Sequence, residues 1–325
     1  MKHRLIACWL AVAAMVPILW PELSIASSGG EAREAHIKVL AVETFLADIA
    51  QNVAGGRVKV NALLPEGADP HDYDATPSDL LKVAASDVVI VNGAGLEAFL
   101  DRLIQNAGGT HRIIDASAGL QYRTNREGEE TEPRDDHKHA EEAELRGHHH
   151  DVDPHFWLVP LNAVKYVENI RDGLSQADPE GKATYAANAD DYIIRLKDLD
   201  KWIEDRVKDI PQNRRLLVTN HESFGYFADR YGFRIVGTIV PSVSTEASPS
   251  AQQLAHLVDT IKTTGVHAIF LETGTNRQLP QQVARETGVK VEELYDHSLS
   301  EHGGPAPDYI SMIKYDTMTI VNALK

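Results

Sequence analysis

Short, continuous apolar runs alternate with longer amphipathic stretches along most of this chain, and this alternation restricts the possible folds more than any other feature. Such runs, bounded by turn residues, are typical of strands buried on both faces of a parallel sheet, with helices in between. The runs lie at residues 36–42, 58–64, 87–92, 111–115, 215–219, 234–239, 267–271 and 289–292. The stretches with helical spacing lie at 45–53, 162–175, 222–231, 249–264, 277–287 and 308–324. The sequence therefore predicts an α/β fold with two series of strands in parallel-type sheets.

One long helical stretch separates the two series. Apolar side chains recur at helical spacing from residue 179 to residue 210, with one proline at its start and another just past its end. A helix of about 30 residues is roughly 45 Å long, which exceeds the width of a small domain. We therefore expect two similar lobes, residues 27–178 and 211–325, joined by a linking helix over residues 179–210.

The first 26 residues have the features of a cleavable export signal. Lys2 and Arg4 form a basic start, and residues 5–20 are almost wholly apolar. Residues 24–26, Ser-Ile-Ala, then provide the small-x-small pattern that signal peptidase recognises. The apolar stretch is short and early for a membrane span, and a retained N-terminal anchor is the alternative. We expect a signal peptide at residues 1–26 and a periplasmic location.

Cys8 is the only cysteine, and it lies inside this signal. The preceding Leu-Ile-Ala resembles a lipoprotein cleavage box, but no apolar region comes before it, so we do not expect a lipid anchor. Cleavage after Ala26 leaves a mature chain without cysteine, which excludes disulfides and thiolate ligands. Any metal must therefore be held by nitrogen and oxygen.

The formal net charge of −16 limits the partners of the chain. Strong acidity argues against nucleic acid or an anionic membrane as a partner and favours the attraction of cations. Charge alone is equally consistent with an exported protein that is simply kept soluble. The charge therefore excludes partners but does not identify a ligand.

Residues 121–153 interrupt the alternation of strands and helices. The segment has almost no apolar residues, is rich in charged ones, and contains His137, His139, His148, His149 and His150. This composition predicts a disordered or weakly ordered loop. Long loops of this kind inside a globular chain are usually functional, although a tolerated surface insertion is the alternative.

Three of the 15 histidines lie where an expected strand ends or an expected helix begins: His71, His155 and His221. In open α/β sheets, ligand sites collect at the carboxyl ends of the strands. Any one of these residues alone is explained most simply as a loop residue. Together, at equivalent places in the fold, they predict a metal site.

The tripeptide Asp-Pro-His occurs twice, at residues 69–71 and 153–155. Proline fixes its own φ and restrains the residue before it, so each imidazole leaves a stiffened backbone. Neutral imidazole is a common zinc ligand, and the carboxylates of Asp69 and Asp153 are candidates to orient the rings. Glu222, next to the third histidine, is a further candidate for this supporting role.

Zinc prefers four ligands, so one more nitrogen or oxygen is needed. Asp296 and His297 follow the last strand of the second series, and Glu272, after the run 267–271, is a weaker candidate. The sequence leaves the choice between Asp296 and His297 open.

Residues 67–73, Gly-Ala-Asp-Pro-His-Asp-Tyr, followed by Thr-Pro-Ser-Asp at 76–79, resemble the first metal-ligand motif of the solute-binding proteins of zinc and manganese ABC importers. Essentially the whole mature chain is similar to this family. The other similar motifs are Asp-Pro-His-Phe-Trp at 153–157, His221 with Phe-Gly-Tyr-Phe at 224–227, Tyr-Gly at 231–232 and Pro-Ser at 249–250. The resemblance implies two α/β lobes joined by a long rigid helix, with the ion in the crevice between the lobes.

Carried over position by position, the resemblance makes His71, His155 and His221 the first three ligands. The family's fourth ligand is usually an aspartate in a pattern like Leu-Tyr-x-Asp-Ser-Leu-Ser. His297 occupies that position here, with Asp296 one residue earlier. Both residues remain candidates.

Manganese-importing members of the family often have a carboxylate where this chain has its third histidine. Three imidazoles suit Zn(II), whereas manganese favours more oxygen ligands. The His-rich loop resembles that of zinc-importing members, which implies low-affinity capture of zinc and its transfer to the main site. We therefore expect a monomeric, high-affinity Zn(II)-binding protein that delivers the ion to an ABC permease, with a zinc-loading metallochaperone as a possible second partner and no nucleic acid.

Three other functions were weighed against this one. A manganese-importing homologue and a passive periplasmic zinc buffer or adhesin share the expected site. A zinc hydrolase would also use three histidines and an open position. The sequence contains neither a His-Glu-x-x-His helix nor a Gly-x-Ser-x-Gly elbow, and Glu222 is supported as a general base only by its position next to His221. We therefore do not expect an enzyme.

Overall fold

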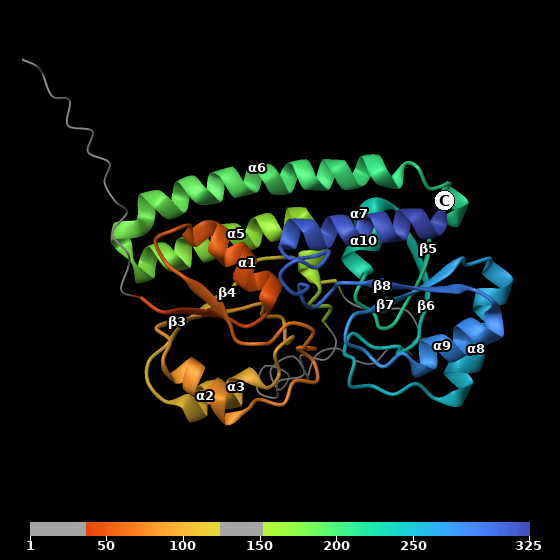
Figure 1. Cartoon of the computed structure of the whole chain (residues 1–325), viewed down its shortest axis with the longest axis horizontal. Coiled ribbons are helices and arrows are strands. Elements are labelled where there is room, and N and C mark those ends of the chain that lie inside the picture. The colour runs from red at the N-terminus through yellow and green to blue at the C-terminus, as the bar shows by residue number, and fades with distance from the viewer. Residues whose placement is uncertain (1–36, 124–151) are drawn as a thin grey trace, which may run out of the picture. The chain divides into compact units, whose positions relative to one another are not determined.

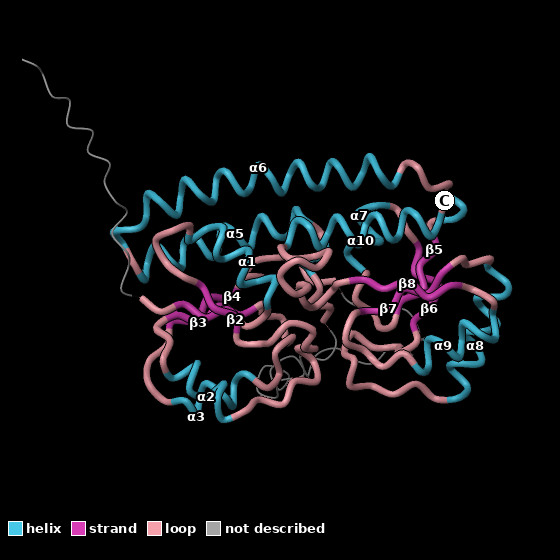
Figure 2. Tube along the Cα trace, in the orientation of Figure 1, coloured by secondary structure: helices cyan, strands magenta, loops and turns pink. Residues whose placement is uncertain are grey.

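Two four-stranded sheets, each with all its strands parallel, form the framework of the structure (Figure 1, Figure 2). The computed structural model describes residues 37–123 and 152–325, which lie in one compact unit of the chain. The strand orders are β2-β1-β3-β4 and β6-β5-β7-β8. The strands are β1 (Val39–Ala41), β2 (Val60–Ala62), β3 (Val88–Val91), β4 (Arg112–Asp115), β5 (Leu216–Thr219), β6 (Arg234–Thr238), β7 (Ala268–Glu272) and β8 (Lys290–Leu294).

Each strand overlaps one of the expected apolar runs. The central strands β1, β3, β5 and β7 are buried at every residue, while the four outer strands are partly exposed. Burial on both faces is what a parallel sheet covered by helices requires. In each sheet the first two strands in the chain lie on one side, and the next two lie on the other side. The order of the strands therefore reverses between the two central strands, β1 and β3 in the first sheet and β5 and β7 in the second. A ligand crevice forms at the carboxyl ends of the strands at such a switch point.

Helices cover both faces of each sheet (Figure 1). On one face, four helices pack against the long helix α6: α1 (Thr44–Ala54), α5 (Pro160–Ala177), α7 (Gly225–Tyr231) and α10 (Tyr309–Leu324). On the other face, the first sheet carries α2 (Pro77–Ala84) and α3 (Leu100–Ala107), and the second carries α8 (Ala251–Thr264) and α9 (Gln278–Thr287). We call the elements before α6 the first lobe and those after it the second lobe.

The long helix α6 (Lys182–Val207) has 26 residues and is therefore about 39 Å long. It contacts α1 and α5 of the first lobe and α7 and α10 of the second. The helix begins at Lys182, later than expected, because Pro179–Gly181 form a separate 3-10 turn, η3. Gly181 there approaches the side chain of Arg57 so closely that a Cβ atom would lie 2.4 Å from Nε. The predicted fold class, two α/β lobes joined by a long helix, is confirmed.

The core beneath α6 is shared by both lobes. Phe45 of α1 stacks on Trp157, with ring centroids 4.5 Å apart, and the hydroxyl of Tyr309 in α10 donates to the carbonyl of Trp157 at 2.5 Å. All three aromatic side chains are fully buried. Burying a large apolar side chain stabilises a fold by about 1.5–3 kcal/mol. The shared core therefore holds the two sheets in one arrangement, while smaller separate cores lie on their other faces.

The helices α2 and α3 are the two described α-helices that the sequence analysis did not name. The Thr-Pro-Ser-Asp motif begins α2 as a capping box: Asp79 N–H points to Thr76 Oγ1 at 3.4 Å, and Thr76 N–H donates to Asp79 Oδ2 at 2.9 Å. The Thr-Pro-Ser-Asp motif, which resembles part of the family's first metal-ligand motif, thus begins a helix next to the loop that carries His71.

The expected signal, residues 1–26, and the five histidines of the expected loop, His137, His139, His148, His149 and His150, lie outside the described residues. Among the residues that are described, no helix combines the length and the apolar character needed to cross a membrane.

Candidate metal centre

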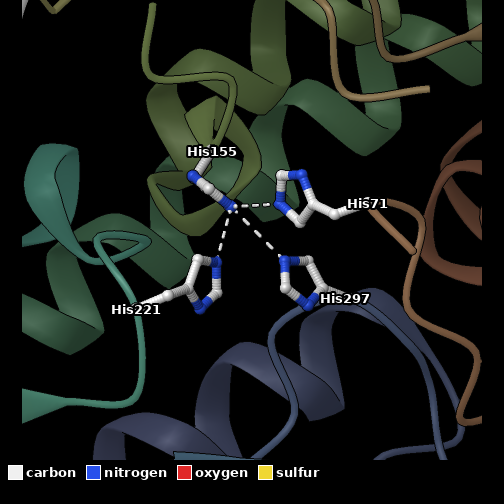
Figure 3. Close-up of side chains that lie close together, drawn as sticks. All are labelled: His71, His155, His221 and His297. Atoms are coloured by element: carbon white, nitrogen blue, oxygen red, sulfur yellow. Dashed lines mark hydrogen bonds between the residues drawn. The ribbon is translucent and has the colours of Figure 1, made fainter. Parts of the chain in front are cut away.

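Four histidine side chains from four separate segments point toward one another between the two lobes (Figure 3). His71 lies between β2 and α2, and His155 directly precedes the 3-10 turn η2 (Phe156–Leu158). His221 follows β5 by two residues, and His297 follows β8 by three. Their exposed fractions are 9%, 0%, 0% and 4%. The structure therefore brings together the three histidines that the sequence singled out, with His297 as a fourth.

The ring nitrogens that face one another are close to van der Waals contact. His155 Nε2 lies 3.2 Å from His71 Nε2, 3.1 Å from His221 Nε2 and 3.3 Å from His297 Nε2. One ligand atom from each of the four rings falls within 4.8 Å of the others. These three contacts to His155 Nε2 cannot all be hydrogen bonds, because that atom carries either one N–H or one lone pair. A central cation bound by the four nitrogens would stabilise this arrangement.

Carboxylates stand behind three of the four rings. Asp153 Oδ1 lies 2.9 Å from His155 Nδ1, Glu272 Oε1 lies 3.1 Å from His221 Nδ1, and Asp296 Oδ1 lies 3.2 Å from His297 Nδ1. A carboxylate at Nδ1 holds the proton there and leaves the lone pair on Nε2. Of the three contacts, the one between Asp153 and His155 is a hydrogen bond, which leaves the lone pair of His155 on Nε2, while Glu272 and Asp296 lie at ion-pair distance from the rings of His221 and His297.

The same three carboxyl groups are buried in the centre. Asp153, Glu272 and Asp296 are at most 1% exposed. Each keeps one oxygen that has no hydrogen-bond partner among the described residues: Asp153 Oδ2, Glu272 Oε2 and Asp296 Oδ2. Uncompensated buried charge is costly, and a nearby cation offsets this cost.

The pKa values reflect the burial of these groups. Burial lowers the pKa of His71, His155 and His297 well below the usual 6.5, and the charge of His221 lowers each further. Burial also opposes charge on His221, but the carboxylates of Glu272, Asp69 and Asp153 together outweigh it, so the pKa of His221 is raised. Three of the four rings are therefore neutral near pH 7, and a proton competes with a metal mainly at His221.

Burial also raises the pKa of the supporting carboxyl groups. The pKa of Asp153 is raised to about 7. That of Asp296 is raised well above its usual value by burial and by the negative charge of Glu272. A bound dication would favour the ionised form of both groups.

The two Asp-Pro-His tripeptides form the same local turn. Asp69 Oδ1 accepts from the N–H of His71 at 2.9 Å, and Asp153 Oδ1 accepts from the N–H of His155 at 3.0 Å. The two aspartates then differ. Asp153 also reaches the ring of its histidine, while Asp69 Oδ2 accepts from Thr245 Oγ1 in the second lobe at 2.6 Å.

The segment that carries His297 is fixed on both sides by contacts from distant parts of the chain. Trp157 Nε1 donates to the carbonyl of Asp296 at 2.6 Å. On the other side, Ser298 Oγ accepts from the N–H of Gly67 at 2.7 Å, and the N–H of Leu299 donates to Thr44 Oγ1 at 2.8 Å. These bonds direct His297 toward the other three rings and place Asp296 behind it.

Two other candidate residues, Asp296 and Glu222, lie outside the group of four rings. Asp296 belongs to a second close group with His221 and Glu272, not to the group of four rings. The backbone N–H of Glu222 donates a hydrogen bond to the carbonyl of Ser242 at 2.9 Å. The carboxylate that lies 3.1 Å from His221 Nδ1 is that of Glu272. From the sequence, Glu272 was expected only as a weaker candidate ligand. Its position as the last residue of β7, at the same sheet edge as His221, was the available signal.

A family model and several known proteins match this chain over nearly its whole length. A family model described as "zinc-uptake complex component A periplasmic" matches residues 39–323. The manganese-binding lipoprotein MntA of Halalkalibacterium halodurans is 32% identical over 318 residues, and the iron-binding protein YfeA of Yersinia pestis is 31% identical over 326 residues. Each match covers 98% of both chains.

Solved structures of similar proteins have the same fold. The periplasmic zinc-binding protein TroA from Treponema pallidum matches with a TM-score of 0.76 and 25% identity, over 89% of this chain and 99% of that one. A manganese-bound periplasmic metal-binding protein from Candidatus Liberibacter asiaticus matches with a TM-score of 0.74 and 26% identity, over 89% of this chain and all of that one. The names of these relatives specify zinc, manganese or iron.

Proposed function

We propose that this chain, which belongs to the family of periplasmic metal-binding components of zinc-uptake complexes, captures Zn(II) and delivers it to an importer. The family consists of substrate-binding proteins of ABC transporters, which bind a divalent metal and work with a membrane permease and its ATPase. It is not a family of enzymes, and this agrees with the absence of a hydrolase motif from the sequence.

The convergence of four Nε2 atoms is the observation that carries the proposal. Zinc–nitrogen distances are about 2.0–2.1 Å, so two nitrogens of a tetrahedral zinc site are about 3.3–3.4 Å apart. The three measured separations from His155 Nε2 are 3.1–3.3 Å. We assign His71, His155, His221 and His297 as the ligands, with Asp153, Glu272 and Asp296 as the carboxylates that orient their rings.

The choice of zinc rests on the donor atoms. Four imidazole nitrogens suit zinc, whereas manganese is held better by carboxylate, carbonyl and water oxygens. Zinc also binds such sites more tightly than manganese or iron(II) in the usual order of affinities. Manganese or iron, which the names of several relatives specify, is the alternative cargo that the experiment below distinguishes.

The remaining parts of the proposal follow from the sequence. The signal at residues 1–26 would export a monomeric protein to the periplasm, and its lobes would be residues 27–178 and 211–325 with the linking helix between them. The His-rich segment 121–153 would capture zinc weakly and pass it on, and a metallochaperone would be a further source. A passive zinc buffer or adhesin is the alternative to transport.

Elemental analysis tests the cargo. The protein is purified from cells supplied with zinc, manganese and iron together, and its metal content is compared with that of His221→Ala. The exposed His256 on α8 provides the matched control, His256→Ala. We expect zinc in the native protein and in the control, and its loss from the tight site in His221→Ala. Manganese or iron in place of zinc would refute the assignment, and unimpaired zinc-limited growth of a deletion strain would favour the passive buffer.

A further inference from the structure

The four rings of the centre are not equally accessible. His71 is 9% exposed, and it lines two neighbouring cavities that none of the other three rings lines. The larger cavity has a volume of about 480 Å³ and is open to the surface. The smaller one, of about 30 Å³, lies between the segment 94–98 of the first lobe and the segment 243–246 of the second. The centre therefore meets the outside of the described structure at the edge of His71.

Three residues line both cavities: His71, Ala98 and Glu246. We propose that the metal ion enters and leaves the centre past His71 through these cavities, and that the carboxylate of Glu246 attracts it there. This access route rests on the proposed binding of zinc by the four histidines. No residue of the route has to be a ligand of the final site.

The charge of the larger cavity favours a cation. Asp72, Asp74 and Glu246 line it, together with one basic residue, Arg102, and all four side chains are exposed. Carboxylates around an opening raise the local concentration of cations and increase the association rate, and salt screens this effect. A divalent ion would therefore meet a negative opening that leads to a histidine.

The position of Glu246 is coupled to that of His71. The residue before it, Thr245, donates through Oγ1 to Asp69 Oδ2 at 2.6 Å, and Asp69 Oδ1 accepts from the N–H of His71 at 2.9 Å. The N–H of Glu246 also points to Ser244 Oγ at 3.3 Å. This chain of contacts across the two lobes holds the carboxylate-bearing segment of the second lobe beside the exposed ligand of the first.

A blocking experiment tests the route on one folded protein. Ala98 is small and exposed, and the chain's one cysteine, Cys8, can be replaced by serine. In a Cys8→Ser, Ala98→Cys protein, the introduced thiol is labelled with a bulky maleimide. The rates of zinc exchange are compared before and after labelling. Ala187→Cys, at an exposed position on α6, is the matched control. Zinc association and dissociation rates are followed by stopped flow with a fluorescent zinc chelator.

We expect the maleimide at position 98 to slow association and dissociation by the same factor, on the order of tenfold, and to leave Kd unchanged. At the control position we expect neither rate to change. Equal rates before and after labelling at position 98 would overturn the route. A native protein that binds no zinc at all would instead overturn the proposed function, so the two failures are distinguishable.

Glu246→Gln tests the role of the carboxylate, with the exposed Glu301→Gln as the control. We expect Glu246→Gln alone to lower the association rate severalfold at low ionic strength, with the difference disappearing at high salt. An association rate unchanged at low salt would remove Glu246 from the route.

Discussion

Replacement of His297 or Asp296 separates a direct zinc ligand from a residue that orients one. His297 Nε2 lies 3.3 Å from His155 Nε2 in the group of four rings, whereas Asp296 Oδ1 lies 3.2 Å from His297 Nδ1, behind the ring. In the proposed site, His297→Ala therefore removes one of four ligands. Asp296→Asn keeps the shape of the side chain and removes only its charge. The two variants should weaken zinc binding to different degrees.

The size of each effect follows from the assigned roles. Four-ligand sites bind zinc with a free energy of about 10–16 kcal/mol. If the four ligands contribute equally, each supplies about 2.5–4 kcal/mol, and loss of one raises Kd roughly 100- to 1000-fold. Loss of a carboxylate that supports a histidine ligand costs about 10- to 100-fold, or about 1.4–2.7 kcal/mol. We expect His297→Ala to weaken zinc binding about tenfold more than Asp296→Asn.

Competition titration with a chelator of known zinc affinity measures both constants, and His256→Ala serves as the control because that histidine is exposed on α8. Cobalt substitution adds an independent readout. The visible spectrum of tetrahedral Co(II) should change in His297→Ala and stay nearly the same in Asp296→Asn. A larger loss of affinity in Asp296→Asn than in His297→Ala would refute our assignment and make Asp296 the fourth ligand.

Three further predictions concern the same centre. Because zinc binds neutral Nε2 and the pKa of His221 is raised, zinc affinity should begin to fall as the pH drops through a value above 6.5; equal affinity at pH 7.5 and 5 would contradict this. Glu272→Gln should weaken zinc binding about 10- to 100-fold and move this pH dependence to lower pH, since Glu272 raises the pKa of His221; an unmoved pH profile in calorimetric titrations would exclude that role. Deletion of residues 132–150 should lower the total zinc content but leave one tight site, and loss of the tight site would show that the segment is part of it.

Much of the fold could be predicted because its signals are local. Continuous apolar runs mark strands buried on both faces, and helical spacing from residue 179 onward marks the long helix. The α-helix begins three residues after the predicted start, because Pro179–Gly181 form a separate 3-10 turn. The Asp-Pro-His turns were also readable, because each aspartate accepts a hydrogen bond from the N–H two residues later.

The sequence by itself determined the α/β class, the two lobes and the three histidines at strand ends. Only the tertiary structure decided which residue completes the group. Asp296 and His297 are adjacent in an irregular segment, so no periodicity sets their directions. Trp157 donates a hydrogen bond to this segment, Gly67 donates one to Ser298, and Leu299 donates one to Thr44, and these bonds across the two lobes fix those directions. Contacts between residues more than 100 positions apart leave no local pattern in a single sequence, which is the physical reason that the sequence left Asp296 and His297 as equal candidates and did not place the carboxylate of Glu272 beside His221.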